Sequence, residues 1–308
     1  MSHIKLFTLG LAVVLALGGC RAQNQQASLS SQTIALTDDL GREVQIPQNP
    51  SRVISLSPEA TEIIYALDAD KSLIAVVNES DYPLQVKDLP KVGSFSSPSY
   101  EGILGLKPDL VIATGHEQSD FVGRLASAGV TVVAIFPKNI AALLLDINML
   151  GTIFSRTDEA DKLVQQINIG LDEVRRMAVN RPRPKVFVEI ADQPLMTVAH
   201  GSLVDELIDI AGGENIGASL PRPYCRIEPE QVLAANPDVI ILAHGAATPS
   251  EVADRPGWRN IRAMQDGCIV SVIDPSLIFR AGPRTVEGAR ALLWAFHPEL
   301  KQLEGTAK

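Results

Sequence analysis

Short runs of apolar residues alternate along this chain with longer stretches in which apolar residues recur every three or four positions. The short runs are rich in Val, Ile and Leu, which is typical of strands buried on both faces. The longer stretches have the period of amphipathic helices. The runs lie at residues 52–56, 73–77, 110–113, 130–136, 185–190, 196–198, 239–242 and 268–273. Strands that alternate with helices predict an α/β fold with mainly parallel sheets.

One unit of this pattern occurs twice, at residues 101–113 and 230–242. In each copy a glutamate opens a short apolar helical pattern, Pro-Asp follows seven residues later, and an apolar run comes next. Proline ends the helix, and the run has the composition of a buried strand. Two copies of one helix–turn–strand unit predict two similar α/β lobes, with a ligand cleft between them.

A long helical pattern separates the two copies. It begins near Thr157, has Asp158 and Glu159 in its first turn, and continues to about Val179. A helix of about 23 residues is roughly 35 Å long. It could be a rigid helix that joins the lobes, or a surface helix of one lobe. We expect an N-terminal lobe over residues 33–156, a linker helix over 157–180 and a C-terminal lobe over 181–308.

Local signals also predict the ends of smaller elements. Residues 34–36 and 43–46 flank a turn and predict a β-hairpin. Ser57 and Pro58 are suited to the N-cap and first position of a helix that continues to about Ala66. A closing helix is predicted from Ala281 to Phe296 because Pro283 lies near its start.

The first 20 residues have the features of an export signal. His3 and Lys5 precede an apolar core over residues 6–17 that is too short to span a bilayer. Residues 17–20, Leu-Gly-Gly-Cys, match the bacterial lipobox, in which Cys20 becomes the lipidated first residue. A plain secretory signal with a chance cysteine is the alternative. Residues 21–32 are polar and predict a flexible tether. We therefore expect a periplasmic or cell-surface lipoprotein, anchored to a membrane.

Composition excludes some functions. The formal charge of −9 argues against a nucleic-acid partner, which needs a basic face. The sequence has no Gly-x-Ser-x-Gly, Walker or His-Glu-x-x-His motif and no glycine-rich dinucleotide turn. We expect no catalytic residues, no metal site and no cofactor. An exported enzyme whose residues converge only in space is the alternative.

Two cysteines follow the predicted lipidation site. Cys225 and Cys268 both fall in the predicted C-terminal lobe, and a disulfide between them is plausible in an exported protein. The alternative is that both thiols are free. Neither has a neighbouring histidine that would indicate a zinc site.

Two histidines and two glutamates occupy matching places in the repeated units. His116 and His244 follow the two repeated strands, and ligands of open α/β sheets bind beyond strand carboxyl ends. Either histidine could also be an ordinary polar loop residue. Glu101 and Glu230 begin the repeated helices, where backbone amides stabilise a carboxylate. Capping alone would explain each one, but a matched pair also suits docking to a two-fold partner.

Several motifs together resemble a known family. They are residues 52–62 (Arg-Val-Ile-Ser-Leu-Ser-Pro-Glu-Ala-Thr-Glu), 80–83 (Ser-Asp-Tyr-Pro), 106–113, 211–215 and 280–284. The chain resembles the periplasmic substrate-binding proteins of ABC importers for cobalamin and iron complexes, most of all the cobalamin-binding members, over about residues 33–300. The resemblance implies two α/β lobes joined by one rigid helix. It also implies that Glu101 and Glu230 are received by arginines on the two permease subunits.

The resemblance further implies a set of ligand contacts. Tyr82 matches the cleft tyrosine of an Asp-Tyr-Pro motif, Phe95 and Tyr224 fall where the cobalamin binders have tryptophans, and Arg280 matches an arginine near the ligand. Thr114 stands where those proteins have another tryptophan, and aromatic residues make up only 5% of the chain. The implied function is capture of cobalamin or another corrinoid and delivery to an ABC permease dimer. Haem or a ferric siderophore is the alternative ligand.

Overall fold

The computed structural model describes residues 33–115 and 117–301. The predicted signal sequence, Cys20, the predicted tether and His116 lie outside these ranges. The described chain begins with an antiparallel hairpin of β1 (Thr33–Thr37) and β2 (Glu43–Pro47), as predicted. Within the same ranges, no helix combines the length and the apolar character that crossing a bilayer requires.

Four parallel strands form the first sheet. Their order is β4 (Leu73–Val76), β3 (Val53–Ser55), β7 (Leu110–Thr114) and β8 (Val132–Ile135). Nearly every residue of these strands is buried, because helices and loops cover both faces of the sheet. The connections contain α1 (Pro58–Ala66), α2 (Tyr100–Leu106), α3 (Ser119–Ser127), the 3₁₀ turns Asp70–Ser72 and Leu84–Asp88, and the short pair β5 (Gly93–Ser94) and β6 (Ser97–Pro98).

The second sheet repeats this topology. Its order is β12 (Glu214–Asn215), β9 (Lys185–Glu189), β14 (Val239–Leu242) and β15 (Ile269–Val270), all parallel. A separate antiparallel sheet contains β10 (Ala191–Asp192), β11 (Leu195–Val198) and β13 (Tyr224–Arg226). The sequence predicted only its middle strand. The remaining elements are α6 (Leu203–Ile210), α7 (Pro229–Ala235), α8 (Pro249–Ala253), the 3₁₀ turn Trp258–Asn260 and α9 (Arg262–Gln265).

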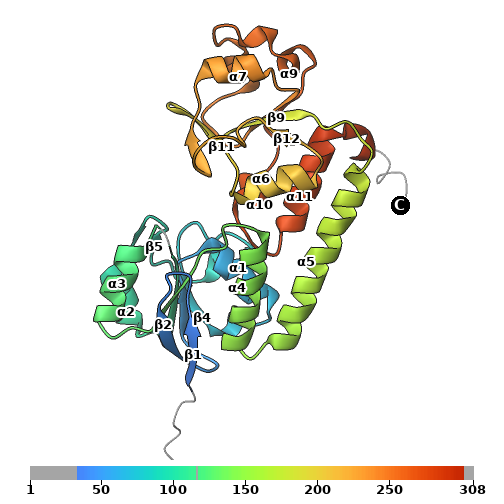
Figure 1. The fold of residues 1–308 in the computed structure, drawn as a ribbon. Coiled ribbons are helices and arrows are strands. Elements are labelled where there is room, and N and C mark those ends of the chain that lie inside the picture. The colour runs from blue at the N-terminus through green and yellow to red at the C-terminus, as the bar shows by residue number, and fades with distance from the viewer. Residues whose placement is uncertain (1–32, 116, 302–308) are drawn as a thin grey trace, which may run out of the picture. The chain divides into compact units, whose positions relative to one another are not determined.

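The long helix α5 (Thr157–Ala178) packs against helices from both halves of the chain. It contacts α4 (Ile140–Ile153), which precedes it, and α6 and α11 (Thr285–Phe296), which follow; Figure 1 shows α4, α5 and α11 side by side. A Cβ placed on Gly170 would lie only 2.6 Å from the side chain of Val286 in α11. The helix therefore packs against elements that precede it and elements that follow it, while its role as a linker stays a prediction. The predicted lobe boundaries stay a prediction.

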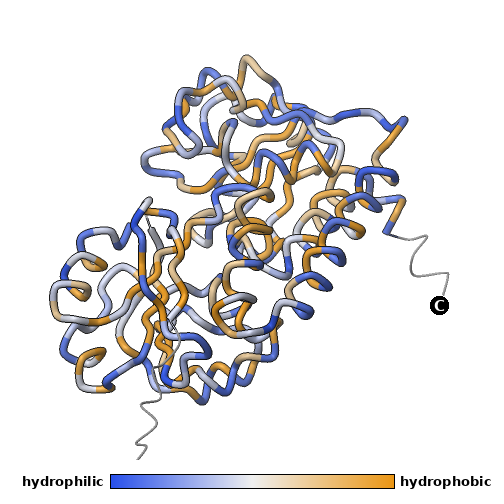
Figure 2. The backbone as a smooth tube through the Cα atoms, turned by 60° about the horizontal axis from the view of Figure 1, so that its bottom comes forward, coloured by the Kyte–Doolittle hydropathy of each residue, from blue (hydrophilic) through white to orange (hydrophobic). Residues whose placement is uncertain are grey.

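Each sheet has one face in a shared core and one face in a core of its own. Val53 and Val188, from the two sheets, belong to one buried cluster, which also holds Leu171 of α5. Ile54 points to the opposite face of the first sheet and Phe187 to the opposite face of the second, where each joins a separate cluster. Figure 2 shows the hydrophobic residues concentrated in the strands, while both colours alternate along the helices.

The two repeated units have matching backbone geometry. Glu101 and Glu230 each occupy the second position of their helices, α2 and α7. Both helices end at a residue in the left-handed region, Lys107 with φ 48° and Asn236 with φ 49°, directly before the proline. The predicted repeat is thus confirmed at the level of the backbone.

The aspartate of each Pro-Asp pair links its strand to the neighbouring strand. Asp109 Oδ2 accepts hydrogen bonds from the amides of Ser51 and Arg52, both at 3.0 Å, just before β3. Asp238 Oδ2 accepts from the amide of Lys185 at 2.8 Å, at the start of β9. The repeated aspartate therefore fixes the same strand pairing in both sheets.

Several predictions differ from the structure; the run at residues 268–273, for example, forms a strand only over Ile269–Val270. The closing helix begins at Thr285 rather than Ala281, because the hydroxyl of Thr285 donates to the carbonyl of Gly282 and closes a turn there; a separate helix, α10 (Pro275–Phe279), precedes it. The disulfide considered above is not formed, since both thiols are free. Cys225 lies in the antiparallel sheet, while Cys268 directly precedes β15 of the parallel sheet.

Candidate functional site

Gln118 holds together the carboxyl edge of the first sheet. The side chain is almost fully buried, its Oε1 accepts from the amide of Thr114 at 3.1 Å, and its Nε2 donates to the carbonyls of Leu56 and Phe95 at 3.1 and 2.8 Å. Leu56 follows β3 and Thr114 ends β7, so one side chain connects two strand ends. Ligands of open α/β sheets bind at this edge. Gln118 fixes the Phe95 loop there.

Phe95 is connected to Arg280 through Glu79. The amide of Phe95 donates to Glu79 Oε2 at 2.7 Å, and Arg280 Nη2 donates to the carbonyl of Glu79 at 3.0 Å. Phe95 and Arg280 are 185 positions apart in the sequence. Phe95 and Arg280, two of the predicted ligand residues, are therefore both hydrogen-bonded to Glu79.

Arg280 and Arg284 form an ion-pair network with two acids of the first half of the chain. Arg280 Nη1 lies 2.6 Å from Asp81 and 3.4 Å from Glu62. Arg284 donates to both oxygens of Glu62, which is only 3% exposed. Burial acts to raise the pKa of Asp81, but the hydrogen bond and charge of Arg280 outweigh it and lower that pKa. We call these four residues the Arg280 network.

One half-exposed aromatic side chain, Tyr82, lies beside this network, and a second, Tyr224, lies near the residue that precedes Arg280. Tyr82 is 43% exposed, and the Arg284 guanidinium lies 4.1 Å from the centre of its ring, within the range of a cation–π contact. Tyr224 is also 43% exposed, and its ring centre lies 6.5 Å from that of Phe279, the residue before Arg280. The two tyrosines offer flat apolar surface near a charged centre.

Two further acids contribute to the electrostatics of this region. Burial raises the pKa of Glu59, against the opposing effects of hydrogen bonds and the Arg280 charge, and Glu117 raises it further. Burial, together with the charge of Glu117, raises the pKa of Tyr224. Glu117 therefore acts electrostatically on groups from both halves of the chain.

His244 makes its contacts away from this network. Its Nδ1 accepts from the amide of Ala246 at 3.1 Å, so its Nε2 carries the proton and donates to Glu189 at 2.9 Å. Glu189 is fully buried and also receives Arg255 at 2.6 and 2.8 Å. Both ring nitrogens are thus used within the protein, and a ligand contact through them stays a prediction.

The two predicted docking residues have exposed side chains. Glu101 and Glu230 are exposed in the first turns of α2 and α7. The N-cap of α2 is Ser99, whose hydroxyl accepts from the amide of Gly102, and the N-cap of α7 is Glu228. Since other residues cap both helices, capping does not explain the two glutamates.

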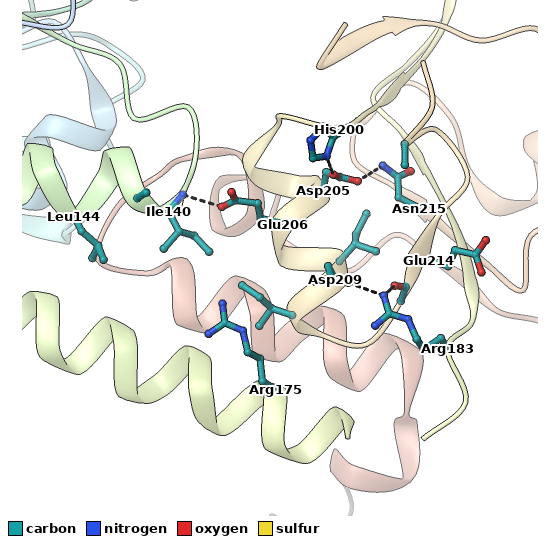
Figure 3. A pocket seen from close by; sticks show the side chains of 15 residues that line it. Ile140, Leu144, Arg175, Arg183, His200, Asp205, Glu206, Asp209, Glu214 and Asn215 are labelled. Carbon is teal, nitrogen blue, oxygen red and sulfur yellow. Dashed lines mark hydrogen bonds and ion pairs between the residues drawn. The ribbon is translucent and has the colours of Figure 1, made fainter. Parts of the chain in front are cut away.

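A hollow of about 690 Å³ lies between α4, α5 and α6 (Figure 3). Its polar groups largely pair with one another: Glu206 accepts from the amide of Ile140 at 2.9 Å, and Arg183 donates to Asp209 at 2.6 Å. Within the described ranges, none of the predicted ligand residues lines it. The hydrogen bond from Ile140 to Glu206 holds α6 against the start of α4. We therefore interpret this hollow as a packing feature and not as the ligand site.

Sequence reasoning missed several members of the site. Glu62 and Arg284 lie inside motifs used for the resemblance, yet neither was singled out. An acid among the buried positions of α1 is a usable signal, because a buried carboxylate needs a partner. Glu59 lies in the same motif as Glu62, whereas Glu117 lies outside the motifs. Within residues 33–115 and 117–301, no group of His, Cys, Asp or Glu is arranged to hold a metal ion.

Comparison with known proteins gives a consistent picture. A family model described as "periplasmic binding protein" matches residues 53–274. The uncharacterized ABC transporter substrate-binding lipoprotein YvrC of Bacillus subtilis (strain 168) is 29% identical over 302 residues, covering 94% of each chain. The vitamin B12-binding protein of Pectobacterium carotovorum subsp. carotovorum (strain PC1) is 30% identical over 248 residues, covering 79% of this chain and 87% of that protein.

Solved structures share the fold. The periplasmic vitamin B12 binding protein BtuF of Vibrio cholerae has a TM-score of 0.69 and 28% identity, covering 81% of this chain and 97% of that one. The periplasmic heme-binding protein RhuT from Roseiflexus sp. RS-1 has a TM-score of 0.70 and 25% identity, covering 80% and 98%. The same architecture is therefore found in proteins named for different ligands.

Proposed function

This chain belongs to the periplasmic binding protein family and is a substrate-binding protein of an ABC transporter, and we propose that it captures cobalamin or a related corrinoid. Members of this family bind a small molecule and pass it to a permease, and they are not enzymes. We further propose that the ligand binds at the carboxyl edge of the first sheet, against the Arg280 network, Tyr82, Phe95 and Tyr224.

The observation that carries the proposal is half-exposed Tyr82 beside the Arg280 network, in which two arginines pair with two acids, together with half-exposed Tyr224 near Phe279. A corrin ring is large and flat, and pockets for such ligands rely on aromatic contacts with a few polar groups. Tyr82 and Tyr224 are each 43% exposed, and the charges of Arg280 and Arg284 are paired with Asp81 and Glu62. Phe95, held by Glu79 and Gln118, adds a third aromatic ring from a fixed loop.

Haem is the second candidate ligand, because a tyrosine can ligate ferric iron as a phenolate. One observation argues against Tyr224 in that role. Burial and the charge of Glu117 raise the pKa of its hydroxyl, which disfavours the phenolate. We therefore rank the corrinoid above haem.

Delivery and anchoring complete the proposal. Glu101 and Glu230 would dock onto two matching permease subunits, since they are exposed at equivalent positions of the repeated units. Lipidation at Cys20 would hold the protein at a membrane, as the lipoprotein designation of the B. subtilis relative supports.

Titration of the purified protein tests the ligand. We expect cyanocobalamin to form a one-to-one complex with a Kd below about 10 μM, or about −7 kcal/mol, measured by calorimetry and by absorbance, and to be recovered unchanged. Haemin and ferric siderophores should bind more weakly. Failure of cyanocobalamin to bind, with tight binding of haemin, would replace the corrinoid by haem.

A further inference from the structure

Another hollow, of about 390 Å³, lies against β13 in the antiparallel sheet. Tyr224 and Arg226 both line it, as expected for alternate residues of one strand, which point to the same face of the sheet. Arg222, which lies two positions before the strand, lines it as well. Two arginines from one short segment therefore share a hollow with a half-exposed aromatic ring.

The lining of this hollow is positively charged, although the protein as a whole has a formal charge of −9. Among the described residues, no aspartate or glutamate lines it. Most of the described arginines pair with an acid, whereas Arg222 and Arg226 have no ion pair or side-chain hydrogen bond with any residue that the structure describes. Arg226 also lines the neighbouring hollow beside Asp192 and Glu228 without pairing with either acid there. Since a guanidinium group stays charged across the physiological pH range, the hollow offers two positive charges to a ligand.

Tyr224 connects this hollow with the proposed ligand site. The centre of its ring lies 6.5 Å from that of Phe279, the residue before Arg280. Arg280 in turn pairs at 2.6 Å with Asp81, the residue before Tyr82. A ligand in contact with the exposed part of Tyr224 therefore has this hollow at its edge.

We propose that Arg222 and Arg226 form a subsite for an anionic oxygen group at the periphery of the ligand, a phosphodiester or a carboxylate. This inference rests on the proposed binding function and specifies a chemical group that the ligand carries. Guanidinium groups donate paired hydrogen bonds to phosphate and carboxylate oxygens, and such charge-assisted bonds are about twice as strong as neutral ones. The arginines of the Arg280 network are already paired with Asp81 and Glu62, which leaves this contact to Arg222 and Arg226. Cyanocobalamin carries a phosphodiester and haem carries carboxylates, so both candidate ligands offer such a group.

The test compares ligands with and without the anionic group, in the unaltered protein and in Arg222→Gln combined with Arg226→Gln. Dicyanocobinamide lacks the phosphodiester of cyanocobalamin together with its nucleotide base. By calorimetry, the double replacement should weaken cyanocobalamin binding by at least about tenfold and change dicyanocobinamide affinity by less than about twofold. The missing base affects both proteins equally, so it cancels from the comparison and the contact with the phosphodiester remains. An unchanged affinity for dicyanocobinamide also shows that the variant is folded, and circular dichroism checks this independently.

Arg176→Gln is the matched control. It removes an exposed arginine from α5 that lines neither this hollow nor the neighbouring one, and it should bind cyanocobalamin as the unaltered protein does. An equal loss of cyanocobalamin affinity in Arg176→Gln would assign the effect to general charge and overturn the subsite.

The remaining outcomes separate the subsite from the proposed function. If the double replacement weakens both corrinoids equally, or neither of them, the subsite is overturned while corrinoid binding stands. If the unaltered protein binds no corrinoid, the proposed function fails, and the subsite is tested with haemin and its dimethyl ester. Weaker binding of haemin, but not of the ester, in the double replacement supports the subsite. Any other result with this pair, including no binding, overturns it.

Discussion

Arg284 donates two hydrogen bonds to the buried carboxylate of Glu62, at 2.8 and 2.6 Å, across 222 positions of the sequence. The pair joins α1, beside the first sheet, to the turn that begins α11. We predict that Glu62→Ala lowers the free energy of unfolding by about 3–5 kcal/mol, because removing one partner of a buried pair leaves the other charge uncompensated. Urea denaturation measures this loss.

An exposed ion pair provides the control. Asp172 and Arg175 pair on the surface of α5 with both side chains more than half exposed, and such pairs contribute about 0–1 kcal/mol. Asp172→Ala should therefore change stability little. A similar small loss for Glu62→Ala would mean that the Arg280 network does not hold the two halves together.

The raised pKa of Asp146 predicts a stability that falls as pH rises. Burial raises its pKa to about 8 in the folded protein, whereas an ordinary aspartate has a pKa of 3.8, so between these pH values the folded state binds more protons than the unfolded state. Stability should then decrease with pH by up to about 1.4 kcal/mol per unit in this window. Asp146→Asn should remove this slope and stabilise the protein at pH 8 more than at pH 5.

Thermal unfolding of both proteins between pH 4 and pH 9 checks this prediction. The ordinary surface carboxylates contribute equally to the two curves, so the difference between the curves isolates Asp146. If the stabilities of the two proteins changed in parallel with pH across this range, Asp146 would have an ordinary pKa, and its charged form would be stabilised in the folded protein.

The docking role of the repeated glutamates can be separated from ligand binding. In Glu101→Ala combined with Glu230→Ala, we predict at least a tenfold weaker association with the transporter, about 1.4 kcal/mol, because both exposed charges are lost. Cyanocobalamin affinity should remain within twofold. Association with permease reconstituted in nanodiscs measures the first effect.

The control for docking is Asp158→Ala, which removes an exposed first-turn carboxylate from α5. It should leave transporter association unchanged. If this variant weakens association as much as the double replacement, general charge rather than the repeated pair governs docking.

His244 should act on stability rather than on ligand binding. Both of its ring nitrogens are hydrogen-bonded within the protein, one to the buried Glu189. His244→Ala should cost about 1–3 kcal/mol of folding free energy and change cyanocobalamin affinity by less than twofold. A tenfold loss of cyanocobalamin affinity in His244→Ala, without a loss of stability, would instead support the ligand contact predicted from the position of His244 after the strand.

Local chemistry made several boundaries predictable. The hydroxyl oxygen of Ser57 caps α1 by accepting a hydrogen bond from the amide of Ala60, and that of Ser202 caps α6 by accepting from the amide of Asp205. The two partners of each hydrogen bond are only three residues apart, so a short sequence pattern is enough to predict the interaction. The closing helix was placed four residues too early because the turn that Thr285 closes onto Gly282 outweighs the proline signal.

The sequence by itself determined the α/β class, the repeated unit and the long helix, because each depends on apolar periodicity and on residues close together in the chain. Only the tertiary structure decided that Arg284 pairs with Glu62, that His244 hydrogen-bonds to Glu189, and that Cys225 and Cys268 are not bonded to each other. These outcomes depend on which side chains the folded backbone brings within hydrogen-bonding distance of each other, about 3 Å between donor and acceptor atoms. Partners so distant in the sequence leave no periodic signal, so the charge balance of the site became visible only in the fold.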